Sequence, residues 1–328
     1  MPPKKAQTNG SHPEKVSKAE ERTQAQNNSK ANDTATNTNK EAKSHNHGTT
    51  KKRKAGDSTS SSNKAPRRSA RSTPSQPINQ LKLLQYLLSP ASLNLCRPKD
   101  ETEDLKNKDA NTRTYSTSSF TPFEELVCAT ILSRPIGHML GLRSIRTIFN
   151  PPYGLTTPKK IREAGNDGCR AALEKARTQH RQKTAEELVI LADAVAETLG
   201  TGEDDVSLGR VREECGSVEE QREMLRKNVK GLGKTGLDIF GRRIQAGWAE
   251  WFPFVDGRTM DAVEKLGLPS SAEGLREVVE KHWAELEVGN FEARDDEEKK
   301  REVFVRILER AVGADLEGKI DDVKAEAV

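Results

Sequence analysis

Hydrophobic residues recur at helical spacing along most of the chain beyond residue 80, and no stretch of a strand's length alternates convincingly between polar and apolar positions. The first helical pattern ends at Pro90 and predicts an amphipathic helix that packs on a folded domain. The pattern is lost from Ser92 to Ser119, where the polar composition predicts a long surface loop. The leucines of the first helix are Leu81, Leu83, Leu84, Leu87 and Leu88.

A stronger start signal follows at Thr121, which precedes Pro122 and stands three residues before Glu124. A capping hydroxyl, a proline at the first helical position and a glutamate at the third are typical of a helix N-terminus. The run Phe123, Leu126, Val127, Thr130 and Ile131 predicts the buried face of this helix.

The remaining patterns predict helices up to the C-terminal end, and together they indicate an all-α fold. Ser217 and Glu220 form a second capping-box pattern, which opens a helix that ends near Gly231. The chain is expected to close in a polar, acidic tail, because residues 284–328 hold 8 basic and 14 acidic residues. The predicted helices are Ile136 to Phe149, a short helix from Thr157-Pro158, Thr184 to Leu199, Ala272 to Trp283 and Glu297 to Val312.

Composition separates residues 1–75 from the rest of the chain. They contain almost no large apolar side chains and hold 16 Lys or Arg against 6 Asp or Glu, so we predict a disordered basic tail. The net charge of +4 therefore belongs to the tail, since the remaining residues carry an acidic excess. We expect four parts: the tail (1–75), a packing helix and long loop (76–120), a central domain (121–269) and C-terminal helices with the acidic tail (270–328).

Two basic clusters in the tail are separated by twelve residues, an interval that resembles a bipartite nuclear-localisation signal. This pattern predicts a nuclear protein that a nuclear import receptor binds. The alternative is a solvated tail that touches nucleic acid without sequence preference. The clusters are Lys51, Lys52, Arg53 and Lys54, followed by Arg67, Arg68 and Arg71.

The four cysteines are widely spaced and lack the short separation of metal or redox motifs, so buried free thiols and no metal site are expected. The chain has no signal-peptide pattern and no apolar run long enough to span a bilayer, so no membrane association is expected. We also expect a monomer.

The most specific motif lies between two predicted helices, at Val229-Lys230-Gly231-Leu232-Gly233-Lys234-Thr235. Two glycines around one apolar residue allow a tight reversal and direct backbone N–H groups outward at a helix start, where a phosphate oxygen can bind. Gly-Lys-Thr also suggests a nucleotide-binding P-loop, but that motif requires glycine at Asn228 and a preceding strand. An ordinary helix-turn-helix corner is the other alternative.

An apolar, aromatic segment from Trp248 to Val255 then leads to Asp256 at a predicted helix start. This arrangement resembles the helix-hairpin-helix DNA glycosylase superfamily, which includes endonuclease III. The family hairpin matches Val229 to Gly233, and its catalytic aspartate, which follows an apolar residue at a helix start, matches Asp256. The Pro-Phe-Glu-Glu-Leu-Val opening, Ile131-Leu132-Ser133 and Lys183-Thr184-Ala185 extend the resemblance over residues 121–269.

The resemblance implies a helix-hairpin-helix DNA glycosylase fold, double-stranded DNA as the partner and base-excision repair as the process. Thr235 stands where bifunctional enzymes have a lysine nucleophile, and the adjacent Lys234 would point about 100° away on a helix, so lyase activity is not expected. No cysteine follows Cys215, so no iron-sulfur cluster and no other cofactor is expected. Arg258 replaces a usual histidine, and Arg134-Pro135 replaces a Gln-rich loop.

Two interpretations of Asp256 remain open. A carboxylate in an apolar cleft could activate water and stabilise a cationic sugar, or Asp256 could serve only as a helix N-cap. The protein is accordingly expected to be a monofunctional DNA glycosylase or a catalytically silent DNA-binding or damage-sensing module. The expected DNA contacts, supported by basic excesses in residues 143–183 and 222–243, are Lys230, Gly231, Leu232, Gly233, Lys234, Thr235, His180, Arg181, Lys183 and Arg134.

Overall fold

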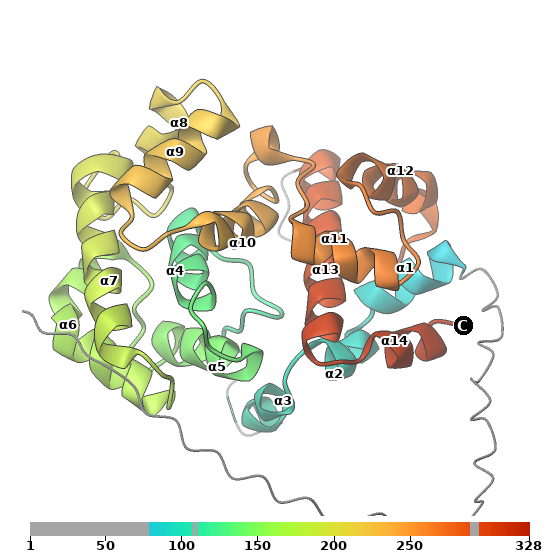
Figure 1. The fold of residues 1–328 in the computed structure, drawn as a ribbon, viewed down its shortest axis with the longest axis horizontal. Coiled ribbons are helices and arrows are strands. Elements are labelled where there is room, and N and C mark those ends of the chain that lie inside the picture. The colour runs from blue at the N-terminus through green and yellow to red at the C-terminus, as the bar shows by residue number, and fades with distance from the viewer. Residues whose placement is uncertain (1–78, 107, 109–110, 289–294) are drawn as a thin grey trace, which may run out of the picture. The chain divides into compact units, whose positions relative to one another are not determined.

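The computed structural model describes residues 79–106, 108, 111–288 and 295–328, and all regular structure within these ranges is helical (Figure 1). The expected all-α class is therefore confirmed for the described part of the chain. The predicted basic clusters of the tail, from Lys51 to Arg71, lie outside the described residues. The α-helices are α1 (Gln80–Leu88), α2 (Leu93–Cys96), α3 (Lys99–Lys106), α4 (Pro122–Leu132), α5 (His138–Phe149), α6 (Pro158–Lys175), α7 (Arg181–Ala194), α8 (Gly209–Glu214), α9 (Val218–Asn228), α10 (Lys234–Ile244), α11 (Gly257–Lys265), α12 (Ala272–His282), α13 (Asp296–Leu316) and α14 (Ile320–Glu326).

The helix starts follow the capping signals of the sequence. Thr121 and Glu124 form a reciprocal box, in which each side chain accepts a hydrogen bond from the other residue's backbone N–H. Ser217 caps α9 by accepting from the N–H of Glu220, but the carboxylate of Glu220 accepts from Gly216 instead of Ser217. Only half of the second predicted box is therefore present.

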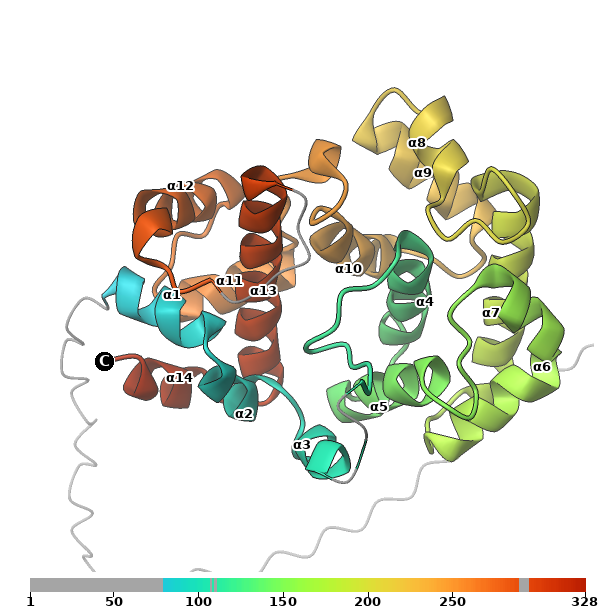
Figure 2. The ribbon, with the colours of Figure 1, turned by 180° about the vertical axis from the view of Figure 1, so that it is seen from behind.

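Buried apolar side chains form two clusters. The first core is built by α4 to α10 and ends at Trp251. The second core joins α1 and α2 to α11, α12, α13 and α14, so the N-terminal helix packs among C-terminal ones (Figure 2). The boundary between the two cores falls between Trp251 and Ala262, earlier in the chain than the expected domain boundary at residue 269.

The expectation of a long surface loop from Ser92 to Ser119 is wrong. This stretch contains α2 and α3, and Tyr115 is 4% exposed. Its polar composition is explained by Arg146, a fully buried arginine on α5 that binds three carboxylates of α3. A helix rich in acidic residues can pack because its partner supplies the opposite charge. The three carboxylates belong to Asp100, Glu101 and Asp104.

Three other expectations need correction. The helix that starts at Pro158 is long, spanning 18 residues with a change of direction at Gly165, where φ is 60°. The helix predicted for Thr184 to Leu199 begins earlier, at Arg181, and its last turn, Val195–Leu199, is a π-helix. The C-terminal residues are not merely a polar tail, because α14 buries Val323 against the second core.

The cysteines are free; Cys96, Cys128 and Cys169 are buried, whereas Cys215 is half-buried. Within the described ranges, no helix is both long enough and apolar enough to cross a membrane.

Candidate functional site

The connection between α9 and α10 is a tight hairpin, as the two glycines predict. Gly231 has φ +80°, and a Cβ atom there would lie 2.8 Å from both Arg134 Nη2 and Glu187 Oε1. Glycine is therefore required at Gly231 for backbone conformation and for space. Gly233 has φ −88° and open space around the position of a Cβ. Leu232 turns inward and is only 3% exposed.

The hairpin presents the first turn of α10 to solvent. Gly233 is the N-cap of this helix, and no side chain caps the helix start. The first N–H groups of a helix have no partner within the helix, so uncapped ones are available to an anion. The exposed residues here are Lys230, Gly231, Gly233, Lys234 and Thr235.

Arg134, one of the expected DNA contacts, lies beneath the hairpin. Its side chain is 13% exposed and forms an ion pair with the buried Glu187 of α7. Lys183 precedes Glu187 by one helical turn, so it lies on the same face of α7, about 6 Å along the axis. Arg134 therefore links the hairpin to α7, and Lys183 is exposed one turn before Glu187 on that helix.

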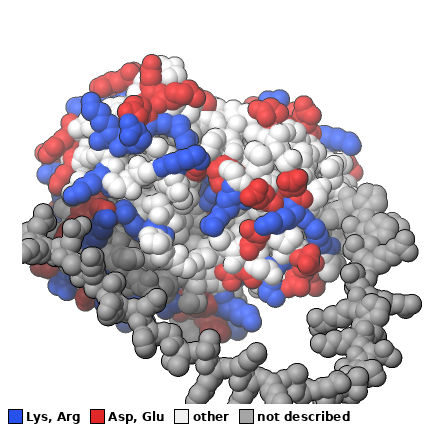
Figure 3. Space-filling model, viewed as in Figure 1, with Lys and Arg blue, Asp and Glu red and all other residues white. Residues whose placement is uncertain are grey.

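His180 and Arg181 are exposed at the start of α7, and His180 occupies a left-handed conformation with φ 55°. In Figure 3, Lys and Arg side chains gather over the side of the molecule formed by α7, α9 and the start of α10. Acidic and basic side chains are interleaved over α11 and α12. The exposed basic residues around the hairpin include Arg226, Lys227, Lys230 and Lys234.

Asp256 is the N-cap of α11, as the sequence predicts. Its Oδ1 accepts hydrogen bonds from the N–H groups of Arg258 (3.1 Å) and Thr259 (3.2 Å). Its Oδ2 accepts from the Thr259 hydroxyl (2.6 Å) and from Arg242 Nη1 (2.8 Å). Burial acts to raise the pKa of Asp256, but the Arg242 charge and these hydrogen bonds outweigh it and lower the pKa. The carboxylate is therefore ionised at neutral pH.

Two of the arginines that contribute to the basic excess in residues 222–243 do not lie on the surface. Arg242 is almost fully buried and donates from Nε to Glu309 of α13 at 2.7 Å, in addition to its bond with Asp256. Arg243 donates from Nε to Glu125 of α4 at 2.9 Å. No local pattern in the sequence indicates these pairings, because the partners lie 67 and 118 residues away.

A cavity of about 430 Å³ lies between the two cores and is lined by Asp256. Lys234 and Thr235 line the same cavity, so the first turn of α10 and the buried carboxylate share one space. The start of α5, at Gly137 and His138, also lines it, and this helix likewise has no side-chain cap. His138 Nδ1 lies 2.7 Å from Glu317 Oε1, which joins the first core to the end of α13.

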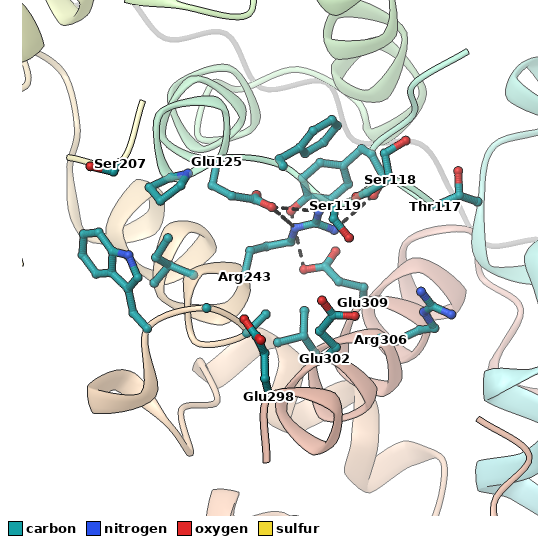
Figure 4. Close-up of a pocket in the computed structure, with 18 of the residues that line it drawn as sticks. Thr117, Ser118, Ser119, Glu125, Ser207, Arg243, Glu298, Glu302, Arg306 and Glu309 are labelled. Atoms are coloured by element: carbon teal, nitrogen blue, oxygen red, sulfur yellow. Dashed lines mark hydrogen bonds and ion pairs between the residues drawn. The ribbon is translucent and has the colours of Figure 1, made fainter. Parts of the chain in front are cut away.

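A second cavity, of about 570 Å³, lies on the far side of Tyr115 and Glu309, which line both cavities. Figure 4 shows Arg243 pointing into it toward Glu125. The Arg243 guanidinium also donates to the backbone oxygens of Tyr115 and Ser118, so it fixes the segment before α4. The charged centre of this cavity thus holds the fold together.

Within the described ranges, no group of three or more His, Cys, Asp or Glu side chains has an arrangement that could hold a metal ion. Comparisons with models of protein families, with curated proteins and with solved structures find no match to this chain.

Proposed function

We propose that this protein binds double-stranded DNA through the α9–α10 hairpin and acts as a monofunctional DNA glycosylase on a base held in the cavity beside Asp256. The observation that carries this proposal is the shared cavity, in which an ionised, buried carboxylate and an uncapped helix start lie together. The helix-hairpin-helix resemblance of residues 121–269 supports the same assignment.

The first step of the proposal is phosphate binding at the hairpin. The N–H groups at the start of α10 and the side chains of Lys230 and Lys234 supply hydrogen bonds and positive charge, which position DNA without reading its sequence. His180, Arg181 and Lys183 extend this basic surface along α7. Arg134, which is largely buried beneath the hairpin, acts by supporting it.

The second step is the placement of the DNA backbone at a fixed distance from Asp256. Helix α10 carries the phosphate site at Gly233 and touches Asp256 through Arg242, nine residues later. Nine residues of α-helix span about 14 Å, so one rigid element fixes the spacing between the DNA backbone and the carboxylate. A base extruded from the duplex could then enter the cavity next to Asp256.

The third step is hydrolysis of the bond between C1′ of the sugar and the base nitrogen. The bonding electrons leave with the base, which takes up a proton, and water adds to C1′ and releases a proton. The positive charge that develops on the sugar is stabilised by the negative Asp256, more strongly in the transition state than in the ground state. No lysine nucleophile is involved, because Thr235 occupies the family position.

A silent DNA-binding module is the second candidate, and one observation favours it. Asp256 already accepts four hydrogen bonds, and one of them comes from the positively charged Arg242. A carboxylate with this many partners has little capacity left to activate water. Under this alternative, Asp256 is a helix cap, and the hairpin and cavity detect damage without chemistry.

Two substitutions test the proposal in parts. Gly233→Asp places a negative charge at the phosphate site and should weaken DNA affinity at least tenfold in a gel-shift titration, whereas Gly233→Ala should bind normally because the position is open. Asp256→Asn should abolish excision of damaged bases while DNA binding persists. Equal affinity of both Gly233 variants would remove the hairpin from the interface, and the absence of excision by the unaltered protein would favour the silent module.

The proposed nuclear localisation of the protein rests on its sequence alone. The two basic clusters, Lys51 to Lys54 and Arg67 to Arg71, support nuclear import by a receptor, in keeping with a substrate in chromosomal DNA. We propose that the protein works as a monomer without an iron-sulfur cluster or other cofactor.

A further inference from the structure

Arg310 of α13 is a buried arginine without a carboxylate partner. It is 6% exposed, and among the described residues it forms no ion pair and donates one hydrogen bond, from Nη1 to the Ser92 hydroxyl at 3.1 Å. Because a guanidinium carries five N–H donors, most of its hydrogen-bonding capacity is unused. Nε and Nη2 have no acceptor in the described part of the chain, and this edge of the guanidinium can hold two oxygens of a single anion.

The described structure gives Arg310 no counter-charge at ion-pair distance. Two other arginines that are buried to this degree, Arg146 and Arg242, bind three and two carboxylates. Burial lowers the pKa of Arg310 to about 10, which leaves it charged at neutral pH. The nearby Cys96 thiol does not offset this charge, because burial raises its pKa to about 11. A buried charge without a counter-charge costs folding free energy, so packing alone does not explain Arg310.

The guanidinium of Arg310 lies at the cavity beside Asp256. Ser92, which accepts its hydrogen bond, directly precedes α2, and residues of α2 line this cavity but not the larger one. Helix α2 packs against α13 (Figures 1 and 2) so closely that a Cβ at Gly313 would collide with the backbone oxygen of Cys96. This packing fixes the position of the guanidinium at the cavity.

The cavity as a whole favours a negatively charged ligand. The three carboxylates that line it are all bound by arginine or lysine side chains. Of its four basic side chains, Arg258 and Arg310 form no ion pair within the described ranges. The starts of α5 and α10 also line it, and neither has a side-chain cap, so their N–H groups add positive potential. Lys234, whose side chain is 84% exposed, lies where the cavity meets solvent.

We propose that this cavity binds a phosphate group, with two phosphate oxygens held by the free edge of Arg310. The planar guanidinium matches phosphate geometry, and the volume of about 430 Å³ is within the range of pockets that bury small ligands. The phosphate belongs either to a DNA strand that enters the cavity or to a free nucleotide. This site goes beyond the proposed function, since it is separate from the phosphate contact at Gly233 and does not depend on base excision.

The test measures binding of inorganic phosphate to the full-length protein, from the rise in the midpoint of thermal unfolding at constant ionic strength set with chloride. Arg310→Met should weaken the apparent phosphate affinity at least about tenfold, because it removes a charge-assisted pair of hydrogen bonds. In phosphate-free buffer the same variant should unfold at an equal or higher temperature, because an unpaired buried charge is replaced by an apolar side chain. An arginine that served only the fold would instead lower the midpoint when it is replaced.

Two further variants serve as controls. Arg301 lies on the same helix and donates one hydrogen bond, from Nε to the Ala246 backbone oxygen at 3.2 Å, but it lines neither cavity. Arg301→Met should therefore keep the phosphate affinity of the unaltered protein. Arg310→Lys keeps the charge but lacks the two-donor edge, so it should bind phosphate with an affinity between those of the unaltered protein and Arg310→Met.

Two more titrations identify the source of the phosphate. If DNA supplies it, Arg310→Met weakens duplex binding in a gel-shift titration. If a free nucleotide supplies it, deoxyadenosine monophosphate binds the unaltered protein more tightly than inorganic phosphate does, and Arg310→Met loses this binding but keeps its duplex affinity. Either result supports the inference.

Three results would overturn it. The first is a phosphate affinity that Arg310→Met retains, or no phosphate binding by the unaltered protein. The second is a clear loss of stability in phosphate-free Arg310→Met, which would assign the arginine to the fold. The third is Arg310-dependent binding of inorganic phosphate with neither DNA nor the nucleotide, which would indicate an adventitious ion only. None of these results bears on the hairpin, which Gly233→Asp tests separately.

Discussion

Arg242 and Asp256 form an ion pair of 2.8 Å between the two cores, across fourteen positions of sequence. Arg242 belongs to α10, the second helix of the hairpin, and Asp256 is the N-cap of α11, a helix of the second core. The same guanidinium binds Glu309 of α13. The candidate site thus depends on a contact that also joins the two halves of the described structure.

Replacing Arg242 should lower the free energy of unfolding. Arg242→Met leaves Asp256 and Glu309, both largely buried, without their cation, and breaking a buried pair typically costs about 3–5 kcal/mol of unfolding free energy. Urea denaturation followed by circular dichroism measures the loss. Arg226→Met is the control, because its ion pair with Glu223 is exposed and should leave stability nearly unchanged. Equal stabilities of the two variants would show that the pair does not hold the cores together.

The two hairpin glycines should respond differently to alanine. Gly231→Ala forces a Cβ into the left-handed region and against the Arg134–Glu187 pair, and should cost about 1–3 kcal/mol with a loss of DNA affinity. Gly233→Ala meets neither obstacle and should be tolerated. Thermal unfolding and gel-shift titration of both proteins check this. A destabilised Gly233→Ala with a normal Gly231→Ala would contradict the hairpin geometry.

Asp205 should make stability depend on pH in acid. Partial burial acts to raise the pKa of Asp205, but hydrogen bonds from Ser207, Thr201 and Gly209 outweigh it and hold the pKa at about 2, below its ordinary value of 3.8. The folded state therefore favours the ionised form, and the resulting stabilisation is present above about pH 4 and lost as the pH falls toward 2.

The comparison of the unaltered protein with Asp205→Asn isolates this group. Denaturant midpoints should differ most near neutral pH, and the difference should shrink between about pH 4 and pH 2. A difference that stays constant over this interval would show that the carboxylate charge is not what holds the loop between Thr201 and Gly209.

Borohydride should trap no covalent complex with damaged DNA. Lys234 lines the cavity, but its Nζ is engaged in an ion pair with Asp238 Oδ2 at 2.6 Å, and Thr235 stands where bifunctional enzymes have their lysine nucleophile. Strand breaks should therefore appear only after alkali treatment of the excision product. Efficient trapping that disappears in Lys234→Ala would replace the monofunctional mechanism by a lyase one.

Local signals in the sequence determined the helical class, the hairpin and several helix starts. Thr121, Ser217 and Asp256 cap the helices that they were expected to cap, because a capping side chain bonds to backbone groups two or three residues away. Gly231 takes the positive φ that a tight turn requires. Each of these features depends on neighbours in the chain and is therefore readable without the fold.

Long-range contacts determined the features that local patterns in the sequence do not predict. The polar stretch after Ser92 folds because Arg146, some 45 residues away, neutralises its carboxylates, and α1 packs beside C-terminal helices. Arg134 and Arg242 looked like surface charges, yet one supports the hairpin and the other binds Asp256. The sequence shows which residues are charged but not which of them form ion pairs. Burial and pairing are properties of the packed chain, and only the tertiary structure shows that Asp256 is capped, paired and next to a cavity.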